Sequence, residues 1–145
     1  MIVHVGEMHL FRLPEGDDLL QALVAHCRGA GIEAAWVHAI GAVRAPVIGA
    51  YDFATGRYRR VALEGDWELL SLSGNVSLAE GHDGPFAHLH VLLGDHEGGV
   101  RGGHLFAAEV RVAEVGLLAL RGGAPQRVPQ ANGLLLWPLA GEEGG

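Results

Sequence analysis

Apolar residues follow helical spacing most clearly in one stretch near the N-terminus. They are Leu19, Leu20, Leu23, Val24 and Cys27, and a period of 3.6 residues places them on one helical face. Gly16 or Asp17 can cap the start of this helix, and Gly29 and Gly31 are suited to end it. The pattern therefore predicts one main helix, with His26 exposed on its flank.

Most of the remaining chain alternates apolar and polar residues or forms short apolar runs between turn residues, as β-strands do. We expect strands over 2–11, 34–40, 47–53, 57–63, 67–77, 86–94, 105–112 and 114–120. Gly41 marks a bulge or a close backbone approach, and Pro46 separates the second strand from the third. Residues 121–132 look irregular, and 133–137 form either a final strand or a plug between subunits.

Short hairpin-like loops join these expected strands. The pattern predicts an α+β domain in which a curved, mostly antiparallel sheet packs against one main helix. Residues 1–138 form this single domain, and 139–145 form a disordered tail rich in glycine and glutamate.

Composition adds an expectation about assembly and location. Apolar residues make up 49% of the 145 residues, which is a surplus that subunits can bury against one another. No apolar run reaches the length of a membrane-spanning helix. The N-terminus carries neither a basic region nor a cleavage signature, so we expect a cytoplasmic protein. Cys27 is the only cysteine, which excludes a disulfide within one chain and favours a buried packing role.

The charge balance argues against a free-standing nucleic-acid binder. The formal net charge is −7 with histidine neutral, whereas phosphate contacts require a basic stripe. The nearest candidate is the group Arg57, Arg59 and Arg60 around Tyr58. It lies near an expected hairpin turn, where a solvated strand face is the ordinary explanation.

Three histidines form the clearest candidate site. His88 and His90 are two residues apart, so in a strand they share a face at roughly 6.6–7 Å along the chain. A turn through the Gly-rich segment 95–99 returns the chain, which brings His104 beside them. Three neutral imidazoles on one face describe a divalent-metal site with an open position. The alternative is that these histidines are solvated or bond across the sheet, since chance pairs are common among nine histidines.

Several ordered blocks resemble the PPC domain, the plant and prokaryote conserved domain. They are 36–43, 68–75 (ELLSLSGN), 85–90 (PFAHLH) and 102–105 (GGHL), and the resemblance covers roughly residues 1–121. It implies an antiparallel sheet with a helix, a homotrimer, and zinc or another divalent metal on His88, His90 and His104. In plant members the segment matching 65–70 contacts partners, which makes Trp67, Glu68 and Leu69 candidate contact residues. Sheet packing is the simpler role for Trp67.

This chain departs from the plant proteins in one respect. It contains no AT-hook, since the Arg-Gly-Arg-Pro core and a basic tail are missing from the sequence. DNA binding that depends on the hook therefore does not carry over.

Three functions remain open. The first is a trimeric module of undefined role that binds a small ligand or a protein partner, with Arg44 available for an anion or an ion pair. The second is a metal-dependent hydrolase, in which the metal lowers the pKa of bound water and a carboxylate from Glu80, Asp83 or Glu109 moves protons. In either case Ser71, Ser73 and Asn75 orient a ligand or support the metal ligands, or they simply bond across the sheet. The third is DNA binding through arginines gathered on one trimer surface.

Overall fold

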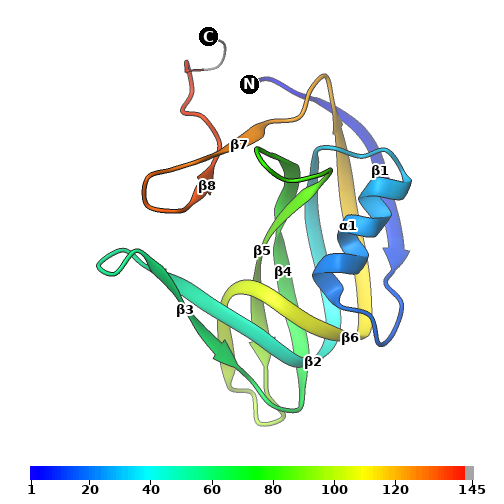
Figure 1. Cartoon of the computed structure of the whole chain (residues 1–145). Helices are drawn as coiled ribbons and strands as arrows, with labels where there is room; N and C mark the ends of the chain where they lie inside the picture. The colour runs from blue at the N-terminus through cyan, green and yellow to red at the C-terminus, as the bar shows by residue number, and fades with distance from the viewer. Residues whose placement is uncertain (143–145) are drawn as a thin grey trace.

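The computed structural model describes residues 1–142 and contains one helix and eight strands (Figure 1). The elements are β1 (His4–Arg12), α1 (Leu19–Gly29), β2 (Ala35–Asp52), β3 (Arg57–Ala62), β4 (Asp66–Ala79), β5 (Phe86–Gly94), β6 (Val100–Arg121), β7 (Gln126–Pro129) and β8 (Leu135–Leu136). This arrangement confirms the predicted α+β fold. The expected tail at 139–145 lies partly outside the described residues, and at 139–142 the Glu142 amide donates to the Leu139 carbonyl at 3.0 Å.

Four strands form a closed circuit of pairings, which explains why the sheet is strongly curved. β2 pairs with β4 and β6, and β5 pairs with the same two strands, all of them antiparallel. β1 and β3 add to the edges on β6 and β2. Register shifts in β2 mark bulges, which bend a strand while keeping most of its ladder.

The expected break between residues 40 and 47 is wrong, because β2 continues through it. Gly41 lies in a bulge with φ 151°, and a Cβ there would come within 1.9 Å of the Val112 carbonyl oxygen. Ala45 has φ 47° just before Pro46, so the chain bends there and resumes pairing with β6 at Val47. The sequence correctly indicates an irregularity at this point. However, hydrogen bonding to the neighbouring strands keeps β2 extended on both sides of it.

Two further strand predictions need correction. The segments 105–112 and 114–120 are one strand, β6, which begins already at Val100. The expected irregular segment 121–132 contains β7, which pairs in parallel with β4 at Leu78. β8, within the expected strand 133–137, pairs with β7. The glycine and proline residues in this segment predicted loops. Short strands form there nevertheless, because β7 can pair with β4 and β8 can pair with β7.

The helix buries Leu19, Leu23 and Cys27 against one face of the sheet. Its cap is Asp18, not Gly16 or Asp17, since the Asp18 carboxylate accepts from the Gln21 amide at 3.0 Å. Asp18 also accepts from the Ala108 amide of β6 at 3.0 Å, which ties the helix start to the sheet. Burial raises the pKa of the Cys27 thiol to about 11, in line with the expected packing role.

The one helix of the described chain covers one face of the sheet and leaves the opposite face free of helices. Figure 1 shows α1 on one side and the β2–β3 hairpin and the β7–β8 arm projecting away from it. Large apolar side chains stay exposed among residues 1–142, including Met8, Leu10, Trp36, Ile40, Leu70, Leu92 and Val112. No helix in the described residues is long and apolar enough to cross a membrane; the cytoplasmic location stays a prediction.

Candidate metal centre

The three histidines come together on the face of the sheet opposite the helix. Along β5, Ala87, Leu89 and Val91 point into the core, so the alternation of a strand turns His88 and His90 to the other face. His104 lies on β6 directly opposite His90 in the ladder. The expected hairpin return is therefore present, and it places the third imidazole beside the other two.

The spacing of the ring nitrogens suits one metal ion. His88 Nε2 and His90 Nε2 are 3.3 Å apart, and a tetrahedral ion with Zn–N bonds of about 2.0–2.1 Å separates two ligand nitrogens by about 3.3–3.4 Å. One nitrogen from each of the three rings lies within 4.8 Å of the other two. His104 Nδ1 is buried without a hydrogen-bond partner in the described residues. The close ring nitrogens, together with a buried imidazole nitrogen without a partner on the third ring, fit a metal ligand set.

The surroundings of His88 and His104 lower the pKa of both side chains, which favours the neutral form that binds a metal. Burial lowers the pKa of His88 to about 4, and the charges of Arg127, His104 and His90 add to this effect. Burial also lowers the pKa of His104, followed by the charges of His90 and Arg60. Protonation would place like charges close together in a partly desolvated site.

A cavity of about 490 Å³ opens beside the histidines. It is lined by residues of the β2–β3 hairpin and of the arm formed by β7 and β8, two segments that lie on the same side of the molecule in Figure 1. Its remaining walls are mostly aromatic and aliphatic and include Tyr51, Tyr58, Phe86 and residues 134–136. The Tyr51 hydroxyl donates to the Asn132 carbonyl at 2.6 Å, so the hairpin and the arm are in contact at its rim.

The family model for the Plants and Prokaryotes Conserved (PCC) domain matches residues 2–121. The chain belongs to this family. It is the PPC domain that the sequence motifs resemble. No curated protein matches the chain with significant similarity.

Solved structures agree with this assignment. A plant- and prokaryote-conserved (PPC) protein of Pyrococcus horikoshii is 44% identical, with a TM-score of 0.90 and 94% of each chain covered. A metal-containing protein of Archaeoglobus fulgidus is 46% identical, with a TM-score of 0.88, over 94% of this chain and 96% of that one. A candidate DNA-binding protein of Bacteroides thetaiotaomicron shares the fold, with a TM-score of 0.81 at 19% identity over 94% and 96% of the two chains.

In this PPC domain, two polar residues of β4 lie in the same cross-strand rows as histidines of the candidate site. Ser73 is opposite His90 and Asn75 is opposite His88 in the ladder. Asn75 Oδ1 accepts from Arg127 Nη2 at 2.8 Å, while Ser71 Oγ lies 3.4 Å from His38 Nε2. Asn75 thus supports a residue of the cavity wall, and Ser71 bonds across the sheet.

The predicted carboxylates do not join the histidines. In the described residues the three-histidine group contains no Asp or Glu. Asp83 forms an ion pair with Arg28 in the last turn of α1. The backbone of Glu109 forms an isolated β-bridge with that of Asp18 at the start of α1. Glu80 is exposed in the turn after β4, where its amide donates to the Arg127 carbonyl at 2.9 Å.

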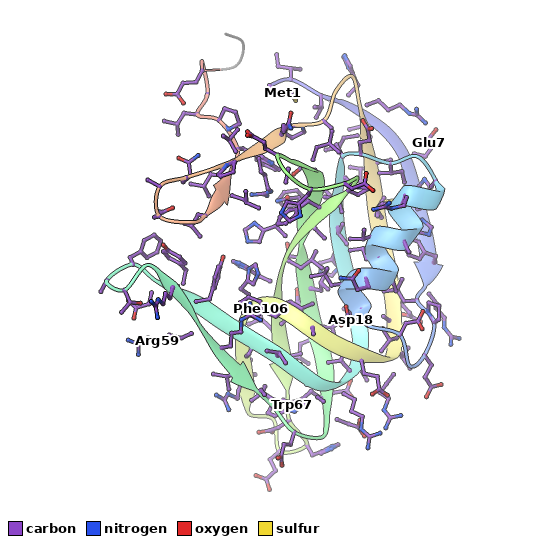
Figure 2. All side chains as sticks on the ribbon, in the orientation of Figure 1. Met1, Glu7, Asp18, Arg59, Trp67 and Phe106 are labelled. Atoms are coloured by element: carbon purple, nitrogen blue, oxygen red, sulfur yellow. The ribbon has the colours of Figure 1, made fainter. Side chains whose placement is uncertain are left out.

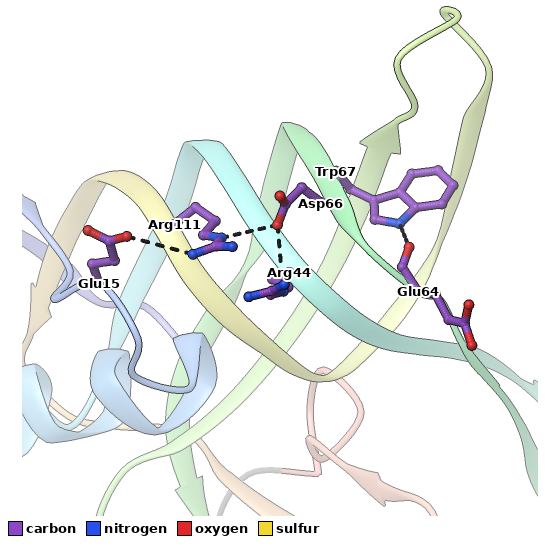
Figure 3. A network of polar contacts seen from close by, with 6 residues as sticks. All are labelled: Glu15, Arg44, Glu64, Asp66, Trp67 and Arg111. Atoms are coloured by element: carbon purple, nitrogen blue, oxygen red, sulfur yellow. Dashed lines mark hydrogen bonds and ion pairs between the residues drawn. The ribbon is translucent and has the colours of Figure 1, made fainter.

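The other predicted contact residues lie elsewhere (Figure 3). Arg44 lies 4.0 Å from Asp66, which also accepts from Arg111. Trp67 is partly buried against the core, and its indole donates to the Glu64 carbonyl at 2.9 Å. Glu68 is exposed, whereas Leu69 is buried. The partner-contact role of this segment stays a prediction.

Sequence reasoning missed Arg127, which is buried in the cavity wall. It follows Pro125 in a segment that looked irregular, so nothing in the local pattern placed it near histidines about forty residues earlier. The parallel pairing of β7 with β4 brings it there. A lone arginine among otherwise uncharged residues near the end of the domain was the one available signal.

Proposed function

We propose that this PPC domain is a metal-binding module that holds one divalent transition metal per chain on His88, His90 and His104 and presents it to a small ligand. The convergence of three imidazole nitrogens within 4.8 Å beside a cavity carries this proposal. The protein from Archaeoglobus fulgidus, named as metal-containing at 46% identity, supports it.

Zinc is the metal that we propose, because three histidines with an open fourth position are a common zinc ligand set. Imidazole also suits nickel, iron and copper. When bound, such an ion supplies a Lewis acid at the cavity wall. The chain's own part is to hold three neutral imidazoles at fixed spacing and to keep the cavity walls apolar.

We also propose a homotrimer, as the family resemblance implies. The helix-free face of the sheet supports it, since cross-strand neighbours place exposed apolar side chains in adjacent rows. Trp36 is opposite Leu118, which is opposite Met8, and Leu10 is opposite Gly116. Trp36 is 52% exposed in the single chain. Exposed apolar surface that continues over several strands is typical of an interface.

A metal-dependent hydrolase is a weaker alternative. The open metal position would activate water, but no carboxylate joins the three histidines among the described residues. Histidine itself would have to act as the base, and all three are used as ligands. Screening esters and phosphodiesters with the zinc-loaded protein would test this reading, and turnover lost in a His88→Ala variant would support it.

DNA binding through the domain surface is the weakest alternative. Arg59 pairs with Asp52 at 2.6 Å, Arg44 lies by Asp66, and Arg60 stacks over Phe106 at 3.9 Å. Figure 2 shows Arg59 and Phe106 on the hairpin side of the molecule. These arginines are engaged within the chain and the net charge is negative. Salt-dependent binding of mixed duplex DNA would support this alternative.

Elemental analysis of protein purified without a polyhistidine tag or chelating column tests the metal proposal. We expect about one zinc per chain, and its loss in a His88→Ala/His104→Ala variant. The matched control is His9→Ala/His26→Ala, which removes two neighbouring imidazoles elsewhere. Equal metal in both variants would exclude the proposed site.

Light scattering tests the trimer, with an expected mass of about 46 kDa for three chains of 15.3 kDa. A Trp36→Glu variant places a charge in the apolar face, so it should shift the protein toward the monomer. A monomer mass for the unaltered protein at working concentration would contradict the trimer.

A further inference from the structure

Arg127 is a buried cation without an acidic partner in the part of the chain that the structure describes. The residue is only 5% exposed. Within residues 1–142, no ion pair joins its guanidinium to a carboxylate. A buried charge is costly unless it is paired. The guanidinium therefore lowers its energy if an anion reaches it.

The hydrogen bonds of Arg127 fix the guanidinium but leave it incompletely satisfied. Nη1 donates to the Leu135 carbonyl at 3.0 Å and Nη2 to Asn75 Oδ1 at 2.8 Å, both neutral acceptors. Nε is buried without a partner in the described residues. The Arg127 guanidinium carbon, Cζ, lies 4.7 Å from the centre of the Trp137 ring. The side chain is thus preorganised, with neutral groups where an ion pair would be expected.

Arg127 and the three histidines line the same cavity. The electrostatic influence of Arg127 on His88 reflects how near they are. No Asp or Glu among residues 1–142 lines this cavity, so a bound divalent ion and Arg127 would together present three positive charges. An anionic ligand would balance part of that charge in a site of low dielectric constant.

The rest of the cavity indicates what the anion is attached to. Tyr51, Tyr58 and Phe86 and the leucines at 134–136 supply mostly apolar walls. The volume of about 490 Å³ is in the range of small-molecule pockets, whose few polar groups orient a mainly apolar ligand. A phosphate group has three or more oxygens to satisfy, which is more than one arginine and one open metal position can contact. A carboxylate has two oxygens, which these two groups can satisfy.

We propose that this cavity binds a small carboxylate with an apolar, ring-sized body, its carboxylate lying between Arg127 and the metal on the three histidines. The inference rests on the proposed metal site and adds the class of ligand to it. Arg127 supplies a positive charge with donors, and the metal supplies an open position. The aromatic side chains of the cavity wall pack against the apolar ring of the ligand. No bond is made or broken in the ligand.

Calorimetric titration of benzoate into zinc-loaded protein tests this inference, with benzamide as the neutral analogue of the same shape. We expect benzoate to bind at least tenfold more tightly than benzamide, because only the anion gains charge-assisted bonds. Acetate, which lacks the ring, should bind more weakly than benzoate. Equal binding of benzoate and benzamide by the metal-loaded protein would overturn the proposal and leave the metal site intact.

Phenyl phosphate separates the two kinds of anion. Binding tenfold tighter than that of benzoate would overturn the carboxylate assignment in favour of a phosphate ester. Binding weaker than that of benzoate would support the carboxylate. These comparisons use the unaltered protein, so they do not depend on whether any variant folds.

Two variants and one metal-free control complete the test. Arg127→Gln should weaken benzoate binding at least tenfold with unchanged zinc content, while Arg12→Gln, which removes an exposed arginine of β1, should leave it unchanged. Removing zinc should also weaken benzoate binding at least tenfold. Unchanged benzoate binding after Arg127→Gln in a folded, zinc-containing protein would overturn the proposal. If elemental analysis finds no zinc in the unaltered protein, the proposed function fails first and this inference fails with it.

Discussion

Two groups of histidines with similar local geometry differ in what surrounds them. His9 Nδ1 and His26 Nε2 are 3.2 Å apart, and His88 Nε2 and His90 Nε2 are 3.3 Å apart. The first pair joins β1 to α1, and the His26 ring stacks on Phe11 with centroids 3.7 Å apart. The expectation that His26 is exposed is therefore wrong: it is half-buried. The second pair has His104 beside it and a cavity in front.

The difference between the two groups indicates under what conditions neighbouring imidazoles require a cation. Two neutral histidines satisfy each other, because one ring nitrogen donates a proton and the other accepts it. Three nitrogens that face one point cannot all be paired by a single shared proton. At His9 and His26 packing and one hydrogen bond are a sufficient explanation. At the triad, an orphaned His104 Nδ1 remains, and a metal ion would resolve the excess of lone pairs.

The largest expected effect separates the two groups by metal affinity. His88→Ala should weaken zinc binding by more than about 100-fold, since loss of a direct ligand exceeds the 10- to 100-fold cost of losing a supporting residue. His26→Ala should change zinc affinity less than about threefold. Competition with a chromogenic chelator measures both. Equal losses in the two variants would show that the groups do not differ in the proposed way.

Stabilisation by the metal should also belong to the triad alone. Zinc at about 100 times its dissociation constant stabilises a folded protein by about 2.7 kcal/mol, or a Tm increase of about 5–10 °C for a domain of this size. We expect this increase in the unaltered protein and in His9→Ala/His26→Ala. It should vanish in His88→Ala/His104→Ala. Differential scanning calorimetry with zinc or EDTA measures it, and a persistent increase in the triad variant would contradict the site.

Without metal, the order of the effects should reverse. His26→Ala removes an aromatic stack and a contact between α1 and β1, so it should lower the free energy of unfolding by about 1–2 kcal/mol. His88→Ala should cost less than about 0.5 kcal/mol, because His88 lines the cavity and has no stacked ring contact like that of His26 with Phe11. Urea denaturation in EDTA measures both. A larger loss for His88→Ala would mean that the triad is a packing feature.

The stability of the metal-free protein should also depend on pH. Burial lowers the pKa of His26, with a further contribution from the charge of His9, and lowers that of His88 to about 4. The unfolded chain takes up these protons first, so stability is greatest above about pH 6.5 and falls as the pH decreases toward 4. His88→Ala and His26→Phe should each flatten this dependence, the former more. Unchanged curves from denaturation at pH 7 and pH 5 would refute this.

The local pattern predicted the elements that are governed by short-range spacing. The helix near Leu19–Cys27 and the strand containing His88 and His90 follow from periods of 3.6 and 2 residues. The pattern correctly marked a bulge at Gly41 but wrongly ended the strand there, and it also failed at Pro46 and in the segment after Arg121. There, pairing with other strands overrides the local preference of glycine and proline to end a strand.

The sequence by itself determined that two imidazoles share a strand face and that the chain resembles the PPC family. Those properties depend on spacing and on ordered motifs. Only the tertiary structure decided that His104 lies in register with His90 and that Arg127 joins the same cavity. Register and the closure of β7 onto β4 depend on contacts between residues far apart in the chain. No local pattern records such contacts, because their energy is gained only once the strands are side by side.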